Sequence, residues 1–231
     1  MSLVECKHVT KKYGMKVALD DVNLTIEKRK IIGLLGPNGS GKTTLIKLLN
    51  DLLVPNSGEI LIQGNHPGVE TKKIISYLPE RTYLSFNMRI KEVIQYFKDF
   101  YDDFREEVAY ELLKKLGINP NDQLKTLSKG MKEKVQLILV MSRKAQLYIL
   151  DEPIGGVDPA ARDYILDTIL KNFNEDASIL IFTHLISDIE KILDEVIFIK
   201  DGKIVLHESC DQLRDESGKS IDGYFREEFK C

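Results

Sequence analysis

One stretch, residues 36–44, limits the possible folds of this chain more than any other feature. It reads Gly-Pro-Asn-Gly-Ser-Gly-Lys-Thr-Thr and matches the pattern G-x-x-x-x-G-K-[ST]. An apolar run suited to a buried parallel strand precedes it at 30–35, and a run with helical spacing follows it at 44–49. A strand, a glycine loop and a helix in this order are the context in which the pattern is a phosphate-binding loop, or P-loop. A glycine turn beside an ordinary surface lysine would not need all four fixed positions.

The chemistry that this loop predicts is the binding of a nucleotide through its phosphates. Glycines allow successive backbone N–H groups to turn toward one anion, and the helix N-terminus adds its positive end. Lys42 is expected to reach the β- and γ-phosphates, and Thr43 to ligate Mg²⁺. The loop residues predicted to bind nucleotide are Gly36, Asn38, Gly39, Ser40, Gly41, Lys42, Thr43 and Thr44.

Length and composition indicate an ordinary globular chain. With 231 residues, 43% of them hydrophobic and 30% charged, it can form one large domain with a full core. The formal net charge of −3 gives no overall basic field, so no nucleic-acid partner is expected. Three widely spaced cysteines without metal-ligand spacing favour a reduced, cytoplasmic protein. There is no signal peptide, and no apolar run approaches the roughly 18 residues of a membrane span.

The N-terminal segment predicts an antiparallel β layer. Residues 3–10 and 17–28 alternate like half-exposed strands, with a turn at 12–14. Two strands before the P-loop strand suggest a layer packed on a nucleotide-binding core. Tyr13, in the turn, lies where a ring can stack on a purine; the alternative is local packing within the turn.

The chain after the P-loop predicts more of the core. The helix is expected to end near Leu53, because Pro55 disfavours helical backbone at the preceding residue. Strands are predicted at 59–63 and 74–78.

Residues 81–142 predict a helical subdomain inserted into an α/β core. Helical patterns cover about 90–101, 103–116 and 129–141, with no strand pattern between them. Aromatic residues are concentrated in and beside this segment. Most of them are expected to pack in a core, and the exposed remainder near residues 83–88 is expected to form a docking groove for another protein. The chain has nine Tyr and nine Phe, and eight of these residues lie in the cluster: Tyr77, Tyr83, Phe86, Tyr96, Phe97, Phe100, Tyr101 and Phe104.

The α/β pattern then returns and completes a single domain. The predicted elements are a strand at 145–150, a helix from an N-cap at Asp158 to about Lys171, a strand at 178–183, a short helix opened by a capping box from Ser187 to Glu190, and a hairpin of 196–200 with 203–207. Residues 208–231 are expected to close on the core as a helix, with a regulatory site as the alternative. We therefore predict a P-loop core with a mainly parallel sheet from 1–80 and 143–207, the β layer, the helical insert 81–142 and the tail 208–231.

Two motifs add chemistry to the P-loop. The strand 147–151 ends in Asp151, which is expected to hold Mg²⁺ opposite Thr43, and the adjacent Glu152 can polarise a water in line with the γ-phosphate. Leu127-Ser-Lys-Gly-Met131 lies at the start of a helix, where Ser128 can cap the helix and the backbone of Gly130 can approach an anion. By itself the second motif is also consistent with an ordinary capped helix.

With these motifs the sequence resembles, over nearly its whole length, the nucleotide-binding subunit of ATP-binding cassette (ABC) transporters. Residues 127–131 are similar to the family signature L-S-G-G-Q, with Ser128 and Gly130 kept and Lys129 and Met131 at the substituted positions. The resemblance implies that Ser128 and Gly130 act in trans on the γ-phosphate held by the partner's P-loop.

The resemblance also implies roles for residues outside the signature. It matches residues 156–158 to the loop that crosses the dimer interface (the D-loop), and Tyr13 to the aromatic that stacks on adenine. It matches His184 to the histidine that hydrogen-bonds the γ-phosphate, although a lone histidine at a strand end is more often a satisfied surface residue. Glu80 stands where the family usually has a glutamine that reaches the metal and the attacking water.

What the resemblance implies about function is an ATPase that drives a transporter. Two copies of the chain, or the chain and a similar cassette, would sandwich two ATP–Mg²⁺, with Lys42, Glu152 and His184 as the catalytic residues. The groove of the helical subdomain would receive a cytoplasmic helix of a separate transmembrane permease. The chain would then lie on the inner face of the cell membrane. Residues 77–80, the short helical region and Lys129 resemble cassettes of bacterial export systems.

Three other classes of protein stay open at this point. A soluble ABC-type ATPase could act on DNA or ribosomes, but the segment between Lys42 and Ser128 is too short for long coiled coils, and the chain has one cassette. Another P-loop enzyme, such as a kinase or GTPase, would not need the later motifs in this order. A regulatory module that has lost catalysis would not need Lys42, Asp151, Glu152 and His184 together.

Overall fold

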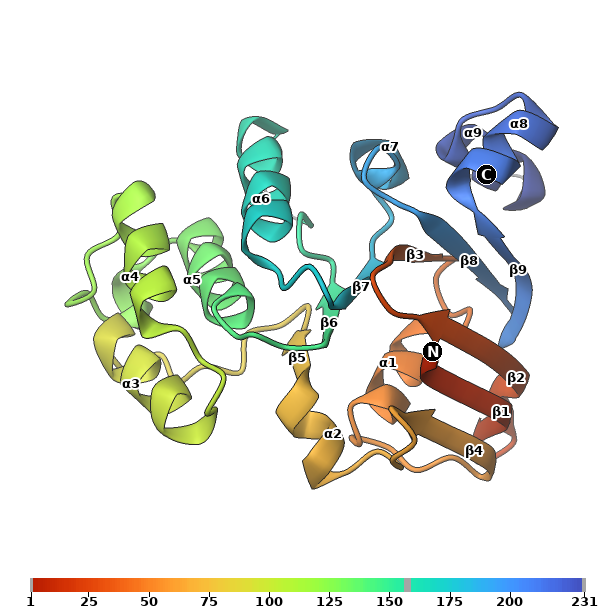
Figure 1. Ribbon diagram of the computed structural model, residues 1–231, viewed down its shortest axis with the longest axis horizontal. Helices are drawn as coiled ribbons and strands as arrows, with labels where there is room; N and C mark the ends of the chain where they lie inside the picture. Colours follow the sequence, from red (N-terminus) through yellow and green to blue (C-terminus); the bar gives the residue numbers. More distant parts are fainter. Residues whose placement is uncertain (1, 156–158, 230–231) are drawn as a thin grey trace.

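Two β-sheets form the frame of the protein (Figure 1). The computed structural model describes residues 2–155 and 159–229. The larger sheet is parallel except for its last strand, and its spatial order is β5 (Ile75–Leu78), β6 (Leu147–Asp151), β7 (Ser178–Phe182), β3 (Ile31–Leu35), β8 (Glu195–Lys200) and β9 (Lys203–Ser209). The smaller sheet is antiparallel, in the order β2 (Lys16–Glu27), β1 (Ser2–Tyr13) and β4 (Ser57–Ile62). The predicted α/β fold with an antiparallel layer is confirmed, and β4 adds a third strand to that layer.

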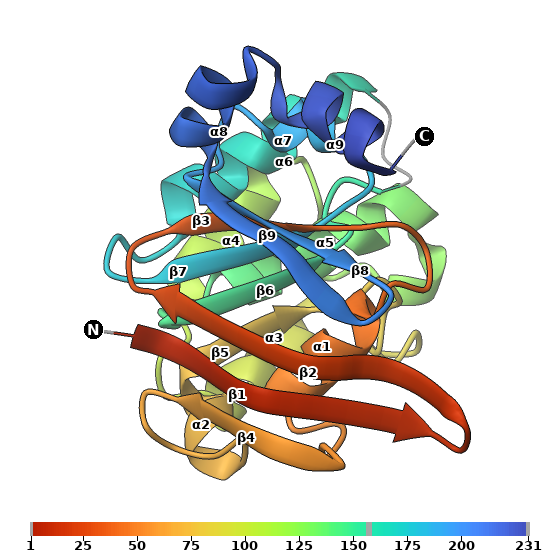
Figure 2. The same cartoon turned by 90° about the vertical axis from the view of Figure 1, so that its right-hand side faces the viewer.

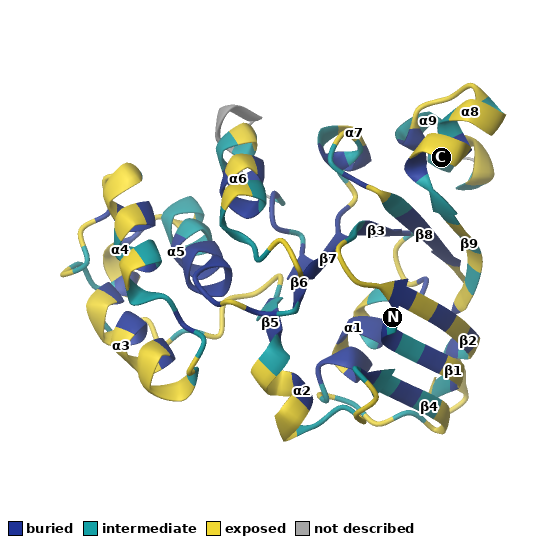
Figure 3. Cartoon of the chain, in the orientation of Figure 1, coloured by how far each residue is buried: buried dark blue, intermediate teal, exposed yellow. Residues whose placement is uncertain are grey.

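The apolar runs of the sequence are the buried central strands. β6 and β7 are buried along their whole length, as Figure 3 shows in dark blue. Successive side chains of a strand point to opposite faces, so each strand supplies two cores. In β7, Ile179 and Ile181 belong to one core, and Leu180 and Phe182 belong to the other. A fully apolar strand is therefore what a sheet covered on both faces requires.

Helix α1 (Lys42–Leu49) is covered by the smaller sheet, which faces the viewer in Figure 2. Its buried side chains, Leu45, Ile46, Leu48 and Leu49, belong to the core that also holds Leu3, Val4, Leu24 and Ile62 of the smaller sheet and Leu34 of β3. The smaller sheet thus holds the P-loop helix in place against the larger one.

The other face of the larger sheet is covered by α5 (Lys129–Met141), α6 (Pro159–Asn172), α7 (Ile186–Ile189), α8 (Cys210–Ser217) and α9 (Ile221–Phe229). The rings of Tyr224, Phe225 and Phe229 pack on Phe198 of β8, with centroids 5.5 to 6.0 Å apart. The described part of the tail thus closes on the core, as two helices rather than one. Strand β9 also runs two residues past the predicted boundary at 207, to Ser209.

A third core lies among α3 (Ile90–Phe100), α4 (Glu106–Lys115), the 3₁₀ turn at Leu124–Thr126 and α5, at the left of Figure 1. Helix α5 has two apolar faces, because Leu137, Val140 and Met141 join the sheet core and Val135, Ile138 and Leu139 join this one. The aromatic cluster divides accordingly. Phe97 and Phe104 are buried here, whereas Tyr83, Phe86, Tyr96 and Phe100 are exposed. Between β4 and β5 lies α2 (Val69–Ile74), a short helix that the sequence did not predict.

The prediction that the P-loop helix ends near Leu53 was wrong. The helix ends at Leu49, because Asp51 takes a left-handed conformation with φ 55°. The N–H of Leu52 then donates to the oxygen of Lys47 at 2.8 Å, and that of Asp51 to the oxygen of Leu48 at 3.1 Å. These two bonds form a Schellman cap, which satisfies the last carbonyl groups of the helix before Pro55 has any effect.

The predicted capping box at Ser187 was also wrong. Helix α7 begins at Ile186, so Ser187 lies inside it. The hydroxyl of Thr183 accepts the N–H of Leu185 at 3.0 Å, which turns the chain into the helix directly after β7. Helix α6 begins with Pro159, the predicted first helical residue. Its predicted N-cap, Asp158, lies outside the described residues.

Candidate functional site

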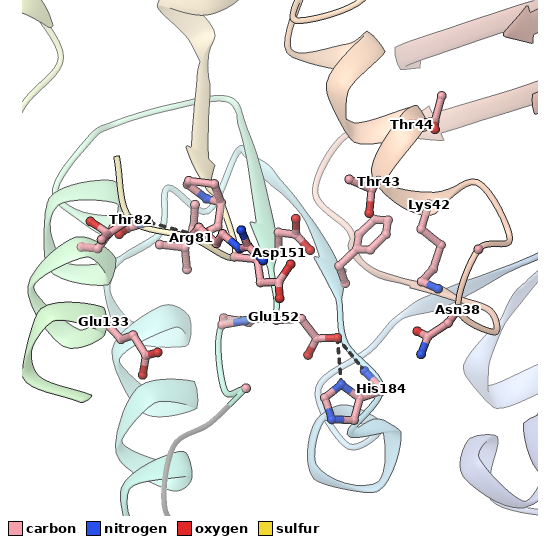
Figure 4. Close-up of a pocket in the computed structure, with 18 of the residues that line it drawn as sticks. Asn38, Lys42, Thr43, Thr44, Arg81, Thr82, Glu133, Asp151, Glu152 and His184 are labelled. Atoms are coloured by element: carbon pink, nitrogen blue, oxygen red, sulfur yellow. Dashed lines mark hydrogen bonds and ion pairs between the residues drawn. The ribbon is translucent and has the colours of Figure 1, made fainter. Parts of the chain in front are cut away.

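A cavity of about 1020 Å³ lies between the P-loop and the carboxyl ends of β5, β6 and β7. Figure 4 shows Lys42 on one wall, with Asp151 and Glu152 facing it. The sequence-predicted site residues that line the cavity are Tyr13, Asn38, Gly39, Gly41, Lys42, Thr43, Thr44, Glu80, Asp151, Glu152 and His184. Segments far apart in the sequence therefore meet here, because parallel strands bring their carboxyl ends to one edge of a sheet.

The first wall is the P-loop between β3 and α1. The ammonium group of Lys42 donates to the backbone oxygens of Gly36 at 2.7 Å and Pro37 at 2.9 Å. Burial lowers the pKa of Lys42, and the nearby Glu152 and Asp151 raise it. Gly41 has φ 109°, and a Cβ there would lie 2.5 Å from the backbone oxygen of Ala18 in β2. The loop can close on the smaller sheet only because this residue is glycine.

Two P-loop residues, Gly36 and Ser40, support the loop from outside the cavity. A Cβ on Gly36 would lie 2.2 Å from the backbone oxygen of Ile199. The backbone oxygen of Ser40 accepts the N–H of Gly202 at 2.9 Å, so the β8–β9 turn is bonded to the loop. The side-chain oxygen of Ser40 is buried and has no hydrogen-bond partner among the described residues. A role of Ser40 in binding nucleotide stays a prediction, because the residue does not line the cavity.

The second wall is acidic. Asp151 ends β6 and is only 9% exposed. Burial, helped by the charges of Glu80 and Glu152, raises the pKa of Asp151 to about 6, although the backbone N–H of Glu80 and the charge of Lys42 act in the opposite direction. A buried carboxylate of this kind favours a bound cation, because the positive charge of the cation stabilises the ionised form that burial disfavours.

Glu152 is held in a strained conformation beside His184. Its backbone angle φ is 52°, a value that residues other than glycine rarely adopt. Its carboxylate accepts the hydroxyl of Thr183 at 2.9 Å and the backbone N–H of His184 at 3.2 Å, and it lies 2.9 Å from Nδ1 of the same histidine (Figure 4). The sequence predicted both Glu152 and His184 but not their contact, and it missed Thr183. Strain that surrounding bonds maintain is typical of functional sites.

The signature residues Ser128 and Gly130 do not line the cavity. Ser128 caps α5, as predicted, by accepting the N–H of Met131 at 3.2 Å. A Cβ on Gly130 would meet no atom of the described chain within 4 Å, so the fold of this chain does not itself require glycine there. The D-loop residues 156–158 lie outside the described part of the chain.

Several cavity residues were not predicted as part of the site. Most are surface residues near a motif, and no sequence signal distinguishes them; Gln136 is different, because it is the polar residue in the buried run 135–141 of α5. The ammonium of Lys132 lies 4.9 Å from the ring of Phe86, which joins α5 to the loop after β5. The residues missed are Lys16, Ala18, Leu78, Pro79, Arg81, Thr82, Phe86, Lys129, Lys132, Glu133, Gln136, Pro153, Gly155 and Phe182.

The donor atoms of the cavity fit Mg²⁺. The hydroxyl of Thr43 and the carboxylates of Asp151 and Glu80 are oxygen donors, the type that Mg²⁺ prefers. Within residues 2–155 and 159–229, no group of three or more His, Cys, Asp or Glu could hold a metal ion. The donors therefore suit an ion that completes its shell with water and substrate phosphates, as Mg²⁺ does in nucleotide sites.

Comparison with known proteins agrees with this geometry. Residues 19–155, more than half of the chain, match the family described as ABC transporter. The chain is 33% identical over 219 residues to the ABC transporter ATP-binding protein YtrB of Bacillus subtilis (strain 168), covering 93% of this chain and 74% of that protein. It is 31% identical to the SkfA peptide export ATP-binding protein SkfE of the same organism, covering 89% of this chain and 88% of that protein.

Solved structures show the same fold and a related sequence. An ATP-binding subunit of an ABC transporter superposes with a TM-score of 0.88 at 28% identity, covering 97% of this chain and 98% of that one. A dimeric ATP-binding cassette in a post-hydrolysis state, bound to ADP and Pi, superposes with a TM-score of 0.78 at 25% identity, covering 89% and 98%. No helix in the described part of the chain is long and apolar enough to cross a membrane. The resemblance inferred from the motifs is confirmed, and this chain belongs to the ABC transporter family as an ATP-binding subunit with ATPase activity.

Proposed function

We propose that this chain is the ATP-hydrolysing motor of a membrane export system and that the cavity between the P-loop and the strand ends is its catalytic site. The observation that carries the proposal is the placement of Glu152. Its strained backbone and its bonds to Thr183 and His184 fix a carboxylate in the cavity that Lys42 lines from the opposite wall. A general base has to be held in this way, within reach of a water and close to the phosphate that the water attacks.

In this proposal the residues divide the work by position. Tyr13 stacks on adenine, and the P-loop residues Gly36 to Thr44 cradle the phosphates through backbone N–H groups and Lys42. Glu152 accepts the proton of the attacking water, whose oxygen forms the new bond to the γ-phosphorus. The bond between the γ-phosphorus and the bridging oxygen breaks, leaving ADP and phosphate, and His184 positions the γ-phosphoryl group. Mg²⁺, held by Thr43, Asp151 and Glu80, would neutralise phosphate charge.

The proposal includes a dimer in which each chain completes the other's site. Ser128 and Gly130 lie outside the cavity of their own chain, and Gly130 has open space around it. Both facts are explained if these residues face the γ-phosphate bound by a partner cassette, either a second copy or a near-relative. A two-fold arrangement makes one surface complementary to itself, so one kind of chain can build both sites. A related cassette forms a dimer in the post-hydrolysis state.

The proposal also includes a separate transmembrane permease on which the chain docks at the inner face of the cell membrane. The segment 81–142, with its own core and its exposed Tyr83 and Phe86, is the proposed helical subdomain that receives the permease. One relative, SkfE, has a name that refers to peptide export, and another, the lantibiotic transport ATP-binding protein SrtF of Streptococcus pyogenes, is 30% identical over 90% of this chain. The name of SkfE supports export as the direction. No nucleic-acid partner is expected.

The test begins with Glu152→Gln. The variant should bind ATP with the affinity of the wild type but hydrolyse it at least ~10²-fold more slowly, because the amide cannot accept the proton. Glu175→Gln, which changes an exposed carboxylate after α6, is the matched control and should leave turnover unchanged. Turnover of Glu152→Gln near the wild-type rate would show that Glu152 is not the base.

The same variant tests the membrane partner. Expressed in its native cell and trapped with ATP and Mg²⁺, Glu152→Gln should bring down a multi-span protein from the membrane fraction. Recovery of ribosomes or DNA instead, or of the soluble chain alone, would favour a soluble ABC-type ATPase and contradict the transporter proposal.

A further inference from the structure

Helix α5 is joined to strand β5 and its following loop by hydrogen bonds at two levels. Near the strand, the hydroxyl of Ser76 donates to the backbone oxygen of Val140 at 2.9 Å. Beyond the end of the strand, Nε2 of Gln136 donates to the backbone oxygen of Pro79 at 3.1 Å. The first bond is within the core, whereas the second lies at the cavity, because Gln136 and Pro79 both line it.

Gln136 is a polar residue where helix packing would favour an apolar one. It is 3% exposed and stands in a run of buried residues from Val135 to Met141. A buried amide is unfavourable unless it is hydrogen-bonded, and a leucine or alanine would fill the position without that requirement. The hydrogen bond to Pro79 is therefore the one interaction for which this position needs a glutamine and not an apolar residue.

The peptide group that Gln136 holds carries Glu80 into the site. This peptide group joins Pro79 to Glu80. The carbonyl oxygen of Pro79 accepts a hydrogen bond from the side-chain amide of Gln136, and the backbone N–H of Glu80 faces the carboxylate of Asp151. That N–H lowers the pKa of Asp151 against the larger effect of burial, which raises it. A hydrogen bond to the oxygen of a peptide group strengthens the bond made by its N–H. The orientation of this one peptide group therefore affects both the N–H that faces Asp151 and the position of Glu80 in the chain.

We propose that Gln136 is a positioning residue that fixes the Pro79–Glu80 peptide group and so holds Glu80 and Asp151 in the geometry that receives the metal–nucleotide complex. This inference rests on the function proposed above and adds a residue to it. Because Ser128 caps the N-terminus of α5, the same helix that presents the signature to the partner's nucleotide also holds the loop of Glu80 at its own site. A shift of α5 would then reach both sites at once.

The experiment measures metal affinity and not turnover alone. Gln136→Met keeps the length and helix preference of the side chain but cannot donate to Pro79. Mn²⁺, which can be followed by electron paramagnetic resonance, replaces Mg²⁺, and a non-hydrolysable ATP analogue occupies the P-loop. We expect the Kd of Mn²⁺ to rise about fivefold, the effect of one ordinary hydrogen bond. The Kd of the analogue measured in EDTA should stay at the wild-type value, since the P-loop is untouched.

Ser76→Ala is the matched control, because it removes the other side-chain bond between the same helix and strand without touching the Pro79–Glu80 peptide. It should lower the melting temperature and leave Mn²⁺ affinity unchanged. If Gln136→Met does not fold, Gln136→Leu replaces it: leucine is uncharged, fills a similar volume and cannot donate to Pro79, and it should weaken Mn²⁺ binding by about the same factor.

Two results would overturn the inference. Mn²⁺ affinity of the Gln136 variants equal to that of the wild type would show that the bond to Pro79 is only structural. An equal loss of Mn²⁺ affinity in Ser76→Ala would show that any loosening of α5 has the same effect. Failure of the wild type to bind Mn²⁺ with the analogue would instead contradict the proposed function, and the inference would fall with it.

Discussion

Asp151→Asn should stabilise the nucleotide-free chain while abolishing its hydrolysis of ATP. In the folded chain, burial and the charges of Glu80 and Glu152 raise the pKa of Asp151 from 3.8 to about 6. Such a rise corresponds to about 3 kcal/mol of lost stability when the carboxylate is ionised. Because Asp151 is 9% exposed, solvent screens little of this effect. After allowance for the buried amide that replaces the charge, a gain of about 1 to 3 kcal/mol in the free energy of unfolding is expected at pH 8.

The stabilisation expected from Asp151→Asn depends on pH in a direction that the raised pKa of Asp151 determines. A carboxyl group whose folded pKa lies above its unfolded pKa lowers stability fully above the folded pKa, here about 6, and has no effect below the unfolded value of 3.8. The advantage of asparagine should therefore shrink by about 1.4 kcal/mol from pH 8 to pH 5, which is about half of the ionisation effect. Urea unfolding in EDTA at both pH values measures it, with Asp163→Asn on the exposed side of α6 as the control. A variant no more stable than the wild type at pH 8, or a gain that grows at pH 5, would refute the reasoning.

Three further substitutions test other parts of the site and its support. Lys42→Ala should raise the Kd of a fluorescent ATP analogue at least about tenfold, through loss of the charge at the phosphates; unchanged affinity would exclude the P-loop as the binding site. Gly41→Ala should lower the free energy of unfolding, measured in urea, by more than about 2 kcal/mol, and Gly39→Ala by only about 1 kcal/mol. The reason is that a Cβ at Gly41 would lie 2.5 Å from a backbone oxygen of β2, whereas a Cβ at Gly39 would meet no described atom within 4 Å. Similar losses for the two variants would contradict this reasoning. Arg143→Met should cost about 3 kcal/mol in the same assay, since the buried guanidinium bonds Asp103 at 2.9 Å, and a stable variant would show that the pair is dispensable.

Features with a local cause could be predicted from the sequence. The strand, glycine loop and helix around Lys42 depend on residues adjacent in the chain, and so does the cap that Ser128 makes on α5. The two wrong helix ends show the limit of such signals. Asp51 took the left-handed conformation that glycine usually provides, and Thr183 displaced the capping box expected at Ser187. In both cases a hydrogen bond to a nearby residue fixed the helix end at a position other than the predicted one.

The site itself divides in the same way. The sequence alone determined which side chains are candidates for the chemistry, because phosphate binding, metal binding and proton transfer each require particular groups at fixed spacings, such as Lys42 with Thr43 and Asp151 with Glu152. Only the tertiary structure decided how these groups meet: that Glu152 is strained against His184, and that Gln136 of α5 holds the loop that carries Glu80. Those contacts join segments far apart in the chain. No local pattern records them, because they depend on the packing of a helix against a strand and on the common edge at which parallel strands end.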